Sequence, residues 1–170
     1  QDILKEKENG GFDAVFVAIG AHLAKKVNIP AQEASKILDA VSFLKDADEN
    51  SEDKPLLGRR VAIYGGGNTA MDAARTAKRL GADEAMIIYR RDREHMPAHE
   101  FEADEALSEG VKIHWLSSIK NMETSSITVE KMQVVDGKAV PTGEYETLEA
   151  DSLILALGQE ADTDFLKHIE

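Results

Sequence analysis

Short apolar runs alternate with helical patterns along the middle of the chain. Residues 61–64, 85–89 and 111–116 are apolar or alternating runs typical of strands. Between the first two runs, residues 68–80 carry alanines at helical spacing, and Gly81 follows where a left-handed C-cap belongs. The order strand, helix, strand requires a right-handed crossover and predicts a parallel sheet.

A second helix is expected before the third of these strands. Pro97 can occupy its first turn, and the helix runs to Gly110. The pattern then changes, because residues 127–148 form alternating segments around an Asp136-Gly137 turn. Such segments predict an antiparallel meander.

Two further apolar runs lie near the ends of the chain. Residues 12–20 and 152–158 are nearly continuous in apolar side chains and end in glycine, which predicts strands buried on both faces. Residues 28–37 are expected to form a proline-marked loop, residues 38–47 a short amphipathic helix, and residues 46–54 a polar, acidic linker.

Composition and charge limit the classes of function. The 170 residues are 42% hydrophobic and 31% charged, which suits one compact domain, alone or with an appended piece. The net charge of -12 argues against nucleic acid and membrane surfaces as partners. Without cysteine the chain can hold no disulfide, thiolate nucleophile or iron–sulfur cluster of its own. No apolar run approaches a membrane span, so we expect a cytoplasmic protein, cut from a longer chain because it begins without methionine.

Three adjacent glycines lie between the first central strand and its helix. Gly65, Gly67 and Ala70 fit the pattern G-x-G-x-x-G/A, which binds the pyrophosphate of a dinucleotide. Gly65 allows a sharp turn, Gly67 lets the backbone approach the pyrophosphate, and Ala70 lets the helix pack close to the strand. The helix N-terminus then offers N–H groups and the positive end of its dipole to the phosphates. The alternative is a glycine turn required for packing alone.

The end of the next strand carries Tyr89, Arg90, Arg91 and Arg93. An acidic residue here would favour NAD, whereas arginine favours the 2'-phosphate of NADP. A guanidinium can bind phosphate through two parallel hydrogen bonds, and Tyr89 or Arg91 can stack on adenine. We therefore predict NADP(H) as the cofactor. The alternative is a solvated arginine run at a strand end.

Other polar clusters predict neither a catalytic residue nor a metal ligand. His95 and His99 have the spacing of a helical metal pair, but Pro97 lies between them and no third ligand is evident. The carboxylates of residues 98–109 fit the solvated face of a helix. No Ser, Thr or Lys nucleophile has a base at a workable spacing.

An ordered set of motifs resembles the NADPH-binding half of the small subunit of glutamate synthase. The motifs are "FDAVFVAIGAH", "GRRVAIYGGGNTAMDAARTAKRLGA", "IIYRRDREHMPA" and "SLILALGQEADTDFL". They are also similar to a domain of dihydropyrimidine dehydrogenase, to ferredoxin:NADP oxidoreductases and, more distantly, to thioredoxin reductase. The resemblance covers essentially the whole chain. It implies a three-layer α/β fold with a Rossmann-like parallel sheet, flanking helices and an antiparallel β-meander insertion.

The resemblance also implies the roles of individual residues. The residues expected at the pyrophosphate are Gly65, Gly66, Gly67, Asn68, Thr69 and Ala70. Those expected around the 2'-phosphate and adenine are Tyr89, Arg90, Arg91 and Arg93, the last standing closer to its neighbours than the matching arginine of thioredoxin reductase. Those that mark the crossings between the FAD and NADPH domains are Ala18, Gly20, Leu157 and Gly158.

The implied domain organisation has three parts. Residues 1–22 would be a crossing segment from a flanking FAD domain, residues 23–55 a loop, short helix and acidic linker, and residues 56–170 the NADPH-binding domain. FAD would be bound mainly by the flanking domain, and iron–sulfur clusters would belong only to the intact enzyme. The implied function is delivery of hydride from NADPH to FAD in an oxidoreductase, and this chain alone is expected to be inactive.

The resemblance implies several partners. They are the FAD domain of the same full-length chain and a large glutamate synthase-type subunit or ferredoxin-type carrier. An exposed strand edge at residues 12–20 would also favour a homodimer. Two other functions stay open: a non-catalytic sensor of nicotinamide nucleotide, and the donor module of a ferredoxin:NADP oxidoreductase or dihydropyrimidine dehydrogenase relative. Fold analogy does not choose among these acceptors.

Overall fold

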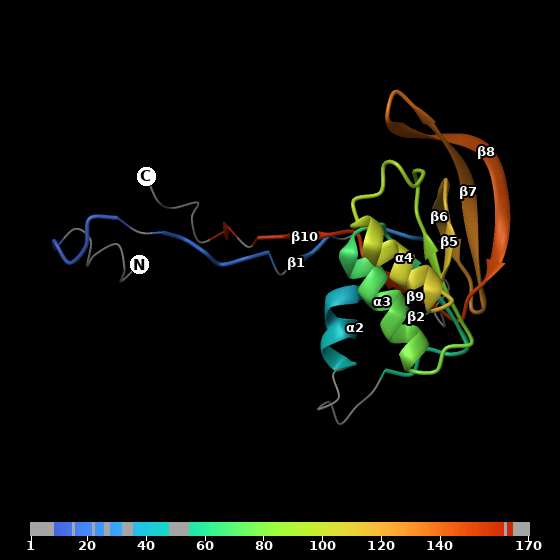
Figure 1. The fold of residues 1–170 in the computed structure, drawn as a ribbon, viewed down its shortest axis with the longest axis horizontal. Helices are drawn as coiled ribbons and strands as arrows, with labels where there is room; N and C mark the ends of the chain where they lie inside the picture. Colours follow the sequence, from blue (N-terminus) through green and yellow to red (C-terminus); the bar gives the residue numbers. More distant parts are fainter. Residues whose placement is uncertain are drawn as a thin grey trace. The chain divides into compact units, whose positions relative to one another are not determined.

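The chain forms two compact units in the computed structural model. One unit comprises residues 1–23 with 160–170, and the other comprises residues 24–159 (Figure 1). The residues that the structure describes are 9–14, 16–21, 23–25, 28–31, 36–47, 55–161 and 163–164. Strands β1 (Leu23–Ala24) and β10 (Gln159–Glu160) pair in a two-stranded sheet.

A five-stranded parallel sheet forms the centre of the unit at residues 24–159, in the order β2-β9-β3-β4-β5. Its strands are β2 (Lys36–Asp39), β3 (Arg60–Tyr64), β4 (Glu84–Ile88), β5 (Lys112–His114) and β9 (Ser152–Leu155). The inner strands are apolar and covered on both faces, as buried parallel sheets require. The order places β3 between β9 and β4, so the carboxyl ends of these three strands meet at one edge.

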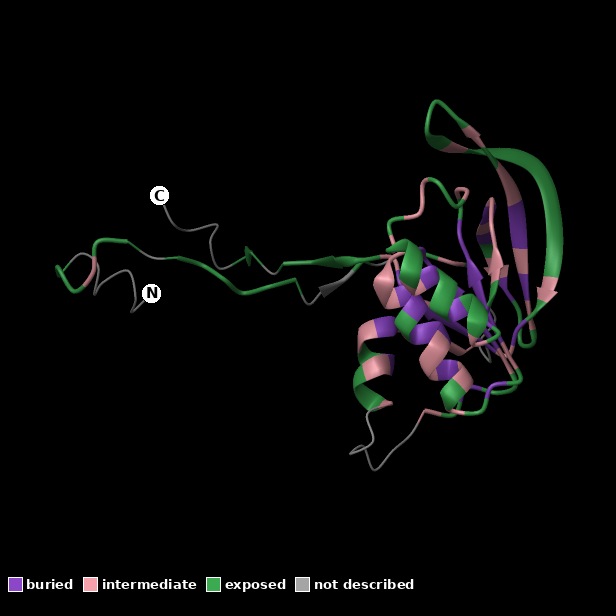
Figure 2. Cartoon of the chain, viewed as in Figure 1, coloured by how far each residue is buried: buried purple, intermediate pink, exposed green. Residues whose placement is uncertain are grey.

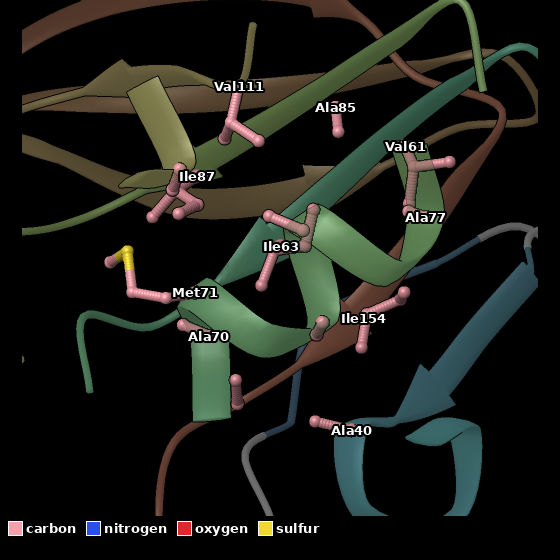
Figure 3. Packing of buried hydrophobic residues seen from close by; sticks show 14 of the residues in the cluster. Ala40, Val61, Ile63, Ala70, Met71, Ala77, Ala85, Ile87, Val111 and Ile154 are labelled. Carbon is pink, nitrogen blue, oxygen red and sulfur yellow. The ribbon is translucent and has the colours of Figure 1, made fainter. Parts of the chain in front are cut away.

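Three helices cover one face of this sheet (Figure 1). They are α2 (Ala40–Asp46), α3 (Asn68–Arg79) and α4 (Glu100–Ser108). Helix α3 turns small side chains to the sheet, and Figure 3 shows Ala77 of this helix beside Val61 of β3, within the same buried cluster as Ala70, Ile63 and Ile154. Because alanine adds little bulk, the helix axis lies close to the strands. Leu80 caps the C-terminus of this helix, and Gly81 follows it with a φ of 97° and donates its N–H to the Lys78 carbonyl, which confirms the expected left-handed glycine at the helix end.

A three-stranded antiparallel sheet covers the other face of the parallel sheet. Its strands are β6 (Ser117–Met122), β7 (Ser126–Val135) and β8 (Lys138–Glu149). A cluster of buried hydrophobic residues between the two sheets joins Ile127 and Val129 of this sheet to Ile88 and Leu153 of the parallel sheet. Figure 2 shows the buried residues gathered between the layers, while β8 is exposed along most of its length. The predicted three-layer α/β fold is confirmed.

The Asp136-Gly137 turn is confirmed, and the strand expected at residues 152–158 forms over its first part as β9 (Ser152–Leu155). Two other expectations are wrong. The expected loop at residues 28–37 contains the start of β2, which pairs with β9. The expected strand at residues 12–20 is not formed, because residues 12–14 and 16–20 lie outside helices and strands. The side chain of Phe16 is 91% exposed there. The described residues offer this run no strand to pair with.

Smaller differences concern the helix around residue 100 and the linker. Pro97 was expected in the first turn of this helix, but it lies before the helix, because α4 begins at Glu100. Most of the expected acidic linker, residues 48–54, lies outside the described residues. The proposed domain boundaries stay a prediction. No helix among the described residues has the length and hydropathy needed to cross a membrane.

Asp151 fastens the amino ends of β9 and β3 together. Its carboxylate accepts hydrogen bonds from the backbone N–H groups of Arg59 (2.9 Å) and Arg60 (2.8 Å), and it pairs with the Arg60 guanidinium at 3.3 Å. Burial by itself raises the pKa of Asp151, but the hydrogen bonds from Arg60 and Arg59 outweigh it and lower the pKa below the usual value. The ionised carboxylate therefore stabilises the folded state.

We expect Asp151→Ala to lower the free energy of unfolding by about 1.5 to 3 kcal/mol, because two backbone donors and a guanidinium lose a charged acceptor. For a chain of this size the melting temperature should fall by roughly 3 to 12 °C. The folded pKa lies below the unfolded value of about 4, so the stabilisation is complete above that pH and disappears as pH falls through the folded pKa.

Thermal melts between neutral and acid pH measure this effect, with Asp72→Ala on the exposed face of α3 as the control. The difference between wild type and Asp151→Ala should be largest near neutral pH and shrink on acidification. A difference that is constant with pH would contradict an ionic role for Asp151.

Candidate functional site

A cleft of about 540 Å³ opens at the carboxyl ends of β3, β4 and β9. This edge is where ligands bind in open parallel sheets. The glycine turn lines the cleft directly before the start of α3. The residues that line the cleft are Lys25, Tyr64, Gly65, Gly66, Gly67, Thr69, Tyr89, Arg90, Arg91, Pro97, Ala156, Leu157 and Gly158.

Gly65 and Gly66 are required by the fold itself. Gly65 has a φ of 153°, which side chains rarely adopt, and a Cβ there would overlap the carbonyl oxygen of Ala156. A Cβ at Gly66 would overlap the ring of Tyr89. The turn is thus pressed between the ends of the two strands that flank β3.

Gly67 differs from both, because the fold gives no reason for glycine there. Its φ of -92° and ψ of 175° are extended values that any residue adopts. No atom lies within 4 Å of the position that its Cβ would take. The open space beside Gly67 faces a helix start, since Gly67 is the N-cap of α3 and gives it no side-chain hydrogen bond. The first N–H groups of the helix and the positive end of its dipole are therefore available to an anion.

Tyr89 and Arg91 form a connected pair at the end of β4. The Arg91 Nε donates to the Tyr89 hydroxyl at 3.1 Å, and the guanidinium carbon lies 5.9 Å from the ring centroid. The Tyr89 hydroxyl donates to the His95 carbonyl at 2.6 Å. Tyr89 is only 5% exposed as a residue, and its ring packs edge-on against Trp115, so little of it is free for adenine. Of the two predicted stacking groups, the Arg91 guanidinium is the accessible one.

The three arginines of this segment have different surroundings. Arg90 is exposed, and neither Arg90 nor Arg91 has a carboxylate partner among the described residues. Arg93 does not line the cleft, and its guanidinium pairs with Asp104 at 2.5 Å. Its predicted place at a phosphate stays a prediction.

Four other predicted site residues are not among those that line the cleft. The Asn68 side-chain oxygen accepts the His99 N–H at 3.1 Å, so Asn68 ties the start of α3 to the segment before α4. Ala70 is fully buried against the sheet, which fits its expected packing role. Ala18 and Gly20 belong to the other compact unit, residues 1–23 with 160–170.

The histidines near the cleft have structural partners. His95 Nδ1 lies 2.6 Å from Asp92, and this hydrogen bond lowers the pKa of the Asp92 carboxyl. His99 stacks on Phe101 with ring centroids 5.6 Å apart. No group of His, Asp and Glu that could hold a metal ion occurs among the described residues.

Sequence reasoning missed four lining residues: Lys25, Tyr64, Pro97 and Ala156. Tyr64 and Ala156 follow from the motifs, because each lies at the end of a strand that runs into a glycine turn. Pro97 was interpreted as part of a helix. Lys25 carried no signal, since only the fold brings it to the end of β9, where its N–H donates to the Gly158 carbonyl at 3.0 Å.

Three curated relatives share about a third of their aligned residues with this chain. The beta subunit of the NADP(+)-dependent formate dehydrogenase of Moorella thermoacetica is 35% identical over 97% of this chain and 25% of that protein. The beta subunit of the NADPH-Fe(3+) oxidoreductase of Geobacter sulfurreducens is 32% identical over 98% and 27%, respectively. The small chain of the NADPH glutamate synthase of Azospirillum brasilense is 32% identical over 88% and 35%. The chain thus spans roughly a quarter to a third of these relatives.

Solved structures share the fold. FprA, an oxidoreductase from Mycobacterium tuberculosis, superposes with a TM-score of 0.67 at 21% identity, over 92% of this chain and 51% of that one. Thioredoxin reductase from T. acidophilum superposes with a TM-score of 0.59 at 16% identity, over 84% and 43%. The family of pyridine nucleotide-disulphide oxidoreductases matches residues 1–170. The chain therefore belongs to the pyridine nucleotide-disulphide oxidoreductase family.

Proposed function

We propose that the cleft binds NADPH and holds it for hydride transfer to FAD in a larger oxidoreductase. One observation carries the proposal: Gly67 faces open space at the uncapped start of α3, although its backbone conformation suits any residue. Glycine at such a position is explained by a ligand whose atoms need the space of a side chain. The pyrophosphate of a dinucleotide is the group that a strand, glycine turn and helix N-terminus accommodate.

The residues present fit the two phosphate groups of NADPH. The N–H groups at the start of α3 would hold the pyrophosphate, with Thr69 beside it in the cleft lining. Arg90 and Arg91 would hold the 2'-phosphate, since neither forms an ion pair with a carboxylate of the described chain. A guanidinium binds a phosphate through two parallel hydrogen bonds, and its plane can also stack on adenine.

The chain contributes binding and orientation to the reaction. NADPH supplies the hydride, which is the chemistry that a bound nicotinamide cofactor brings. The cleft residues would fix the nucleotide so that its nicotinamide faces the flavin, and the walls from Ala156 to Gly158 would keep water from that end. No catalytic side chain is required of this chain for such a transfer.

The relatives support a role within a larger assembly. Those named above are subunits of NADP-linked oxidoreductases, and this chain spans a quarter to a third of them. We infer that an FAD domain in the same full-length chain receives the hydride, with Ala18, Gly20, Leu157 and Gly158 near the crossings. Iron–sulfur clusters elsewhere in the enzyme and a glutamate synthase-type large subunit or a ferredoxin-type carrier would take the electrons onward.

We expect NADPH to bind more tightly than NADH, and the double variant Arg90→Ala, Arg91→Ala to lose this preference. Removing a charge-assisted phosphate contact costs about 1.5 to 3 kcal/mol, or roughly ten- to hundredfold in affinity. Calorimetric titration with both nucleotides measures the effect.

Two single variants serve as controls in the same titration. Arg59→Ala removes an arginine at the opposite end of β3, where it pairs with Asp83, and should leave both affinities unchanged. Arg93→Ala tests the remaining arginine of the segment. Equal affinity of the wild-type chain for NADPH and NADH would contradict the role given to Arg90 and Arg91.

We expect Gly67→Val to abolish NADPH binding while the fold persists. The branched side chain would fill the space that the pyrophosphate needs, yet it meets no protein atom within 4 Å of its Cβ. Circular dichroism reports the fold, and the same titration reports binding. Unchanged affinity would show that the open space has no ligand.

A matched alanine pair separates the two kinds of glycine in the turn. Gly66→Ala should destabilise the chain by about 1 to 3 kcal/mol, because the new Cβ overlaps the Tyr89 ring. Gly67→Ala should change the melting temperature little. If both variants melt alike, the distinction between a fold glycine and a ligand glycine is wrong.

The isolated chain should be colourless and should not reduce a dye acceptor with NADPH. A longer protein that includes the flanking FAD domain should be yellow and should reduce the dye, because the flavin is the hydride acceptor. Visible absorbance and a dye-reduction assay of both proteins test this. NADPH oxidation at enzymatic rates by the colourless chain would place the catalysis in this chain instead.

A further inference from the structure

The cleft has two sides, and the two arginines occupy one of them. Strands β4 and β9 flank β3 on opposite sides in the sheet order. Arg90 and Arg91 follow β4, whereas Ala156, Leu157 and Gly158 follow β9. Both groups line the same cleft, with the glycine turn after β3 between them.

This arrangement assigns the halves of a bound dinucleotide. NADP carries its extra phosphate on the adenosine half, so Arg90 and Arg91 draw that half to the β4 side. With the pyrophosphate at Gly67, the nicotinamide half then lies on the β9 side. This step rests on the proposed function, because it takes NADP(H) as the ligand of the cleft.

Lys25 is the cationic residue that the fold adds to the β9 side. Its backbone N–H donates to the Gly158 carbonyl at 3.0 Å, which fixes the residue against the turn after β9. Its Cδ lies 3.9 Å from the position that a Cβ on Gly158 would take, so the aliphatic stem runs along this turn. Gly158 itself has a φ of 98°. Lys25 thus lines the cleft on the side opposite the arginines.

We propose that Lys25 is a positioning residue that binds the nicotinamide half of NADP(H). Its ammonium donates hydrogen bonds to the phosphate and ribose oxygens of that half, which are acceptors for a compact cation. Arg90 and Arg91 select the nucleotide through its adenosine half, and Lys25 holds the half that reacts. Orientation of the nicotinamide therefore depends on a residue that lies far in sequence from the glycine turn and from the two arginines.

Two ligands of different length test the proposal by calorimetry on the full chain. NADPH contains both halves, whereas 2'-phospho-AMP is the adenosine half alone. Lys25→Met keeps the aliphatic stem on Gly158 and removes the charge, so it should weaken NADPH binding by about tenfold. The same variant should bind 2'-phospho-AMP as the wild type does, while Arg90→Ala should weaken both ligands.

Two further variants complete the design. Lys25→Arg retains a cation and should restore most of the NADPH affinity, and Lys45→Met, on the exposed side of α2, should change neither ligand. Equal losses for NADPH and 2'-phospho-AMP in Lys25→Met would overturn the assignment to the nicotinamide half. An unchanged NADPH affinity in Lys25→Met would overturn it as well. Wild-type chain that binds neither ligand would instead overturn the proposed function, and this inference with it.

Discussion

The close approach of three backbone segments at the glycine turn is the constraint on which the site depends. Gly65 presses against the carbonyl of Ala156 at the end of β9, and Gly66 presses against the Tyr89 ring at the end of β4. Side chains at either position would separate strands that must stay in register on both sides of β3. The next residue, Gly67, lines the cleft, and apart from its chain neighbours no heavy atom of the protein lies within 4 Å of the position that its Cβ would take. The fold therefore requires two of the three glycines, whereas the third is the one for which we propose that a ligand is the reason.

The helices on one face of the parallel sheet and the antiparallel sheet on the other contribute differently to the cleft at the carboxyl ends of β3, β4 and β9. Helix α3 follows the glycine turn directly, and its buried alanines bring its start close to the strand ends. The antiparallel sheet on the other face reaches the same edge through β6, where the Ser118 hydroxyl is hydrogen-bonded to that of Tyr64 at 2.8 Å. One layer therefore supplies a helix N-terminus, and the other supports a residue of the cleft wall from behind.

The sequence pattern predicted those elements whose conformation depends on residues that are close together in the chain. The strands β3, β4 and β9, helix α3 and its glycine C-cap, and the hairpin turn at Asp136 follow from residues adjacent in sequence. Strand β2 was missed because it is a short piece whose identity depends on pairing with the distant β9. The run at residues 12–20 was overestimated because apolar character alone provides no partner strand. In the cleft, the glycines and arginines could be predicted because they form a sequence motif. Lys25 could not, because the tertiary fold brings it to the cleft, where its backbone N–H donates to the Gly158 carbonyl.

Charge pairing gives the cleft its electrostatic character. The chain carries 32 carboxylates against 20 lysines and arginines, so an arginine on this surface readily finds an acidic neighbour. Arg59, Arg60, Arg75, Arg79 and Arg93 all pair with carboxylates of the described chain. Arg90 and Arg91 do not, although Asp92 follows them directly. The Oδ1 atom of Asp92 instead accepts the N–H of His95 and lies 2.6 Å from His95 Nδ1. Two arginines of the segment between β4 and α4 therefore have no carboxylate partner in the described chain, and both line the cleft with their positive charge.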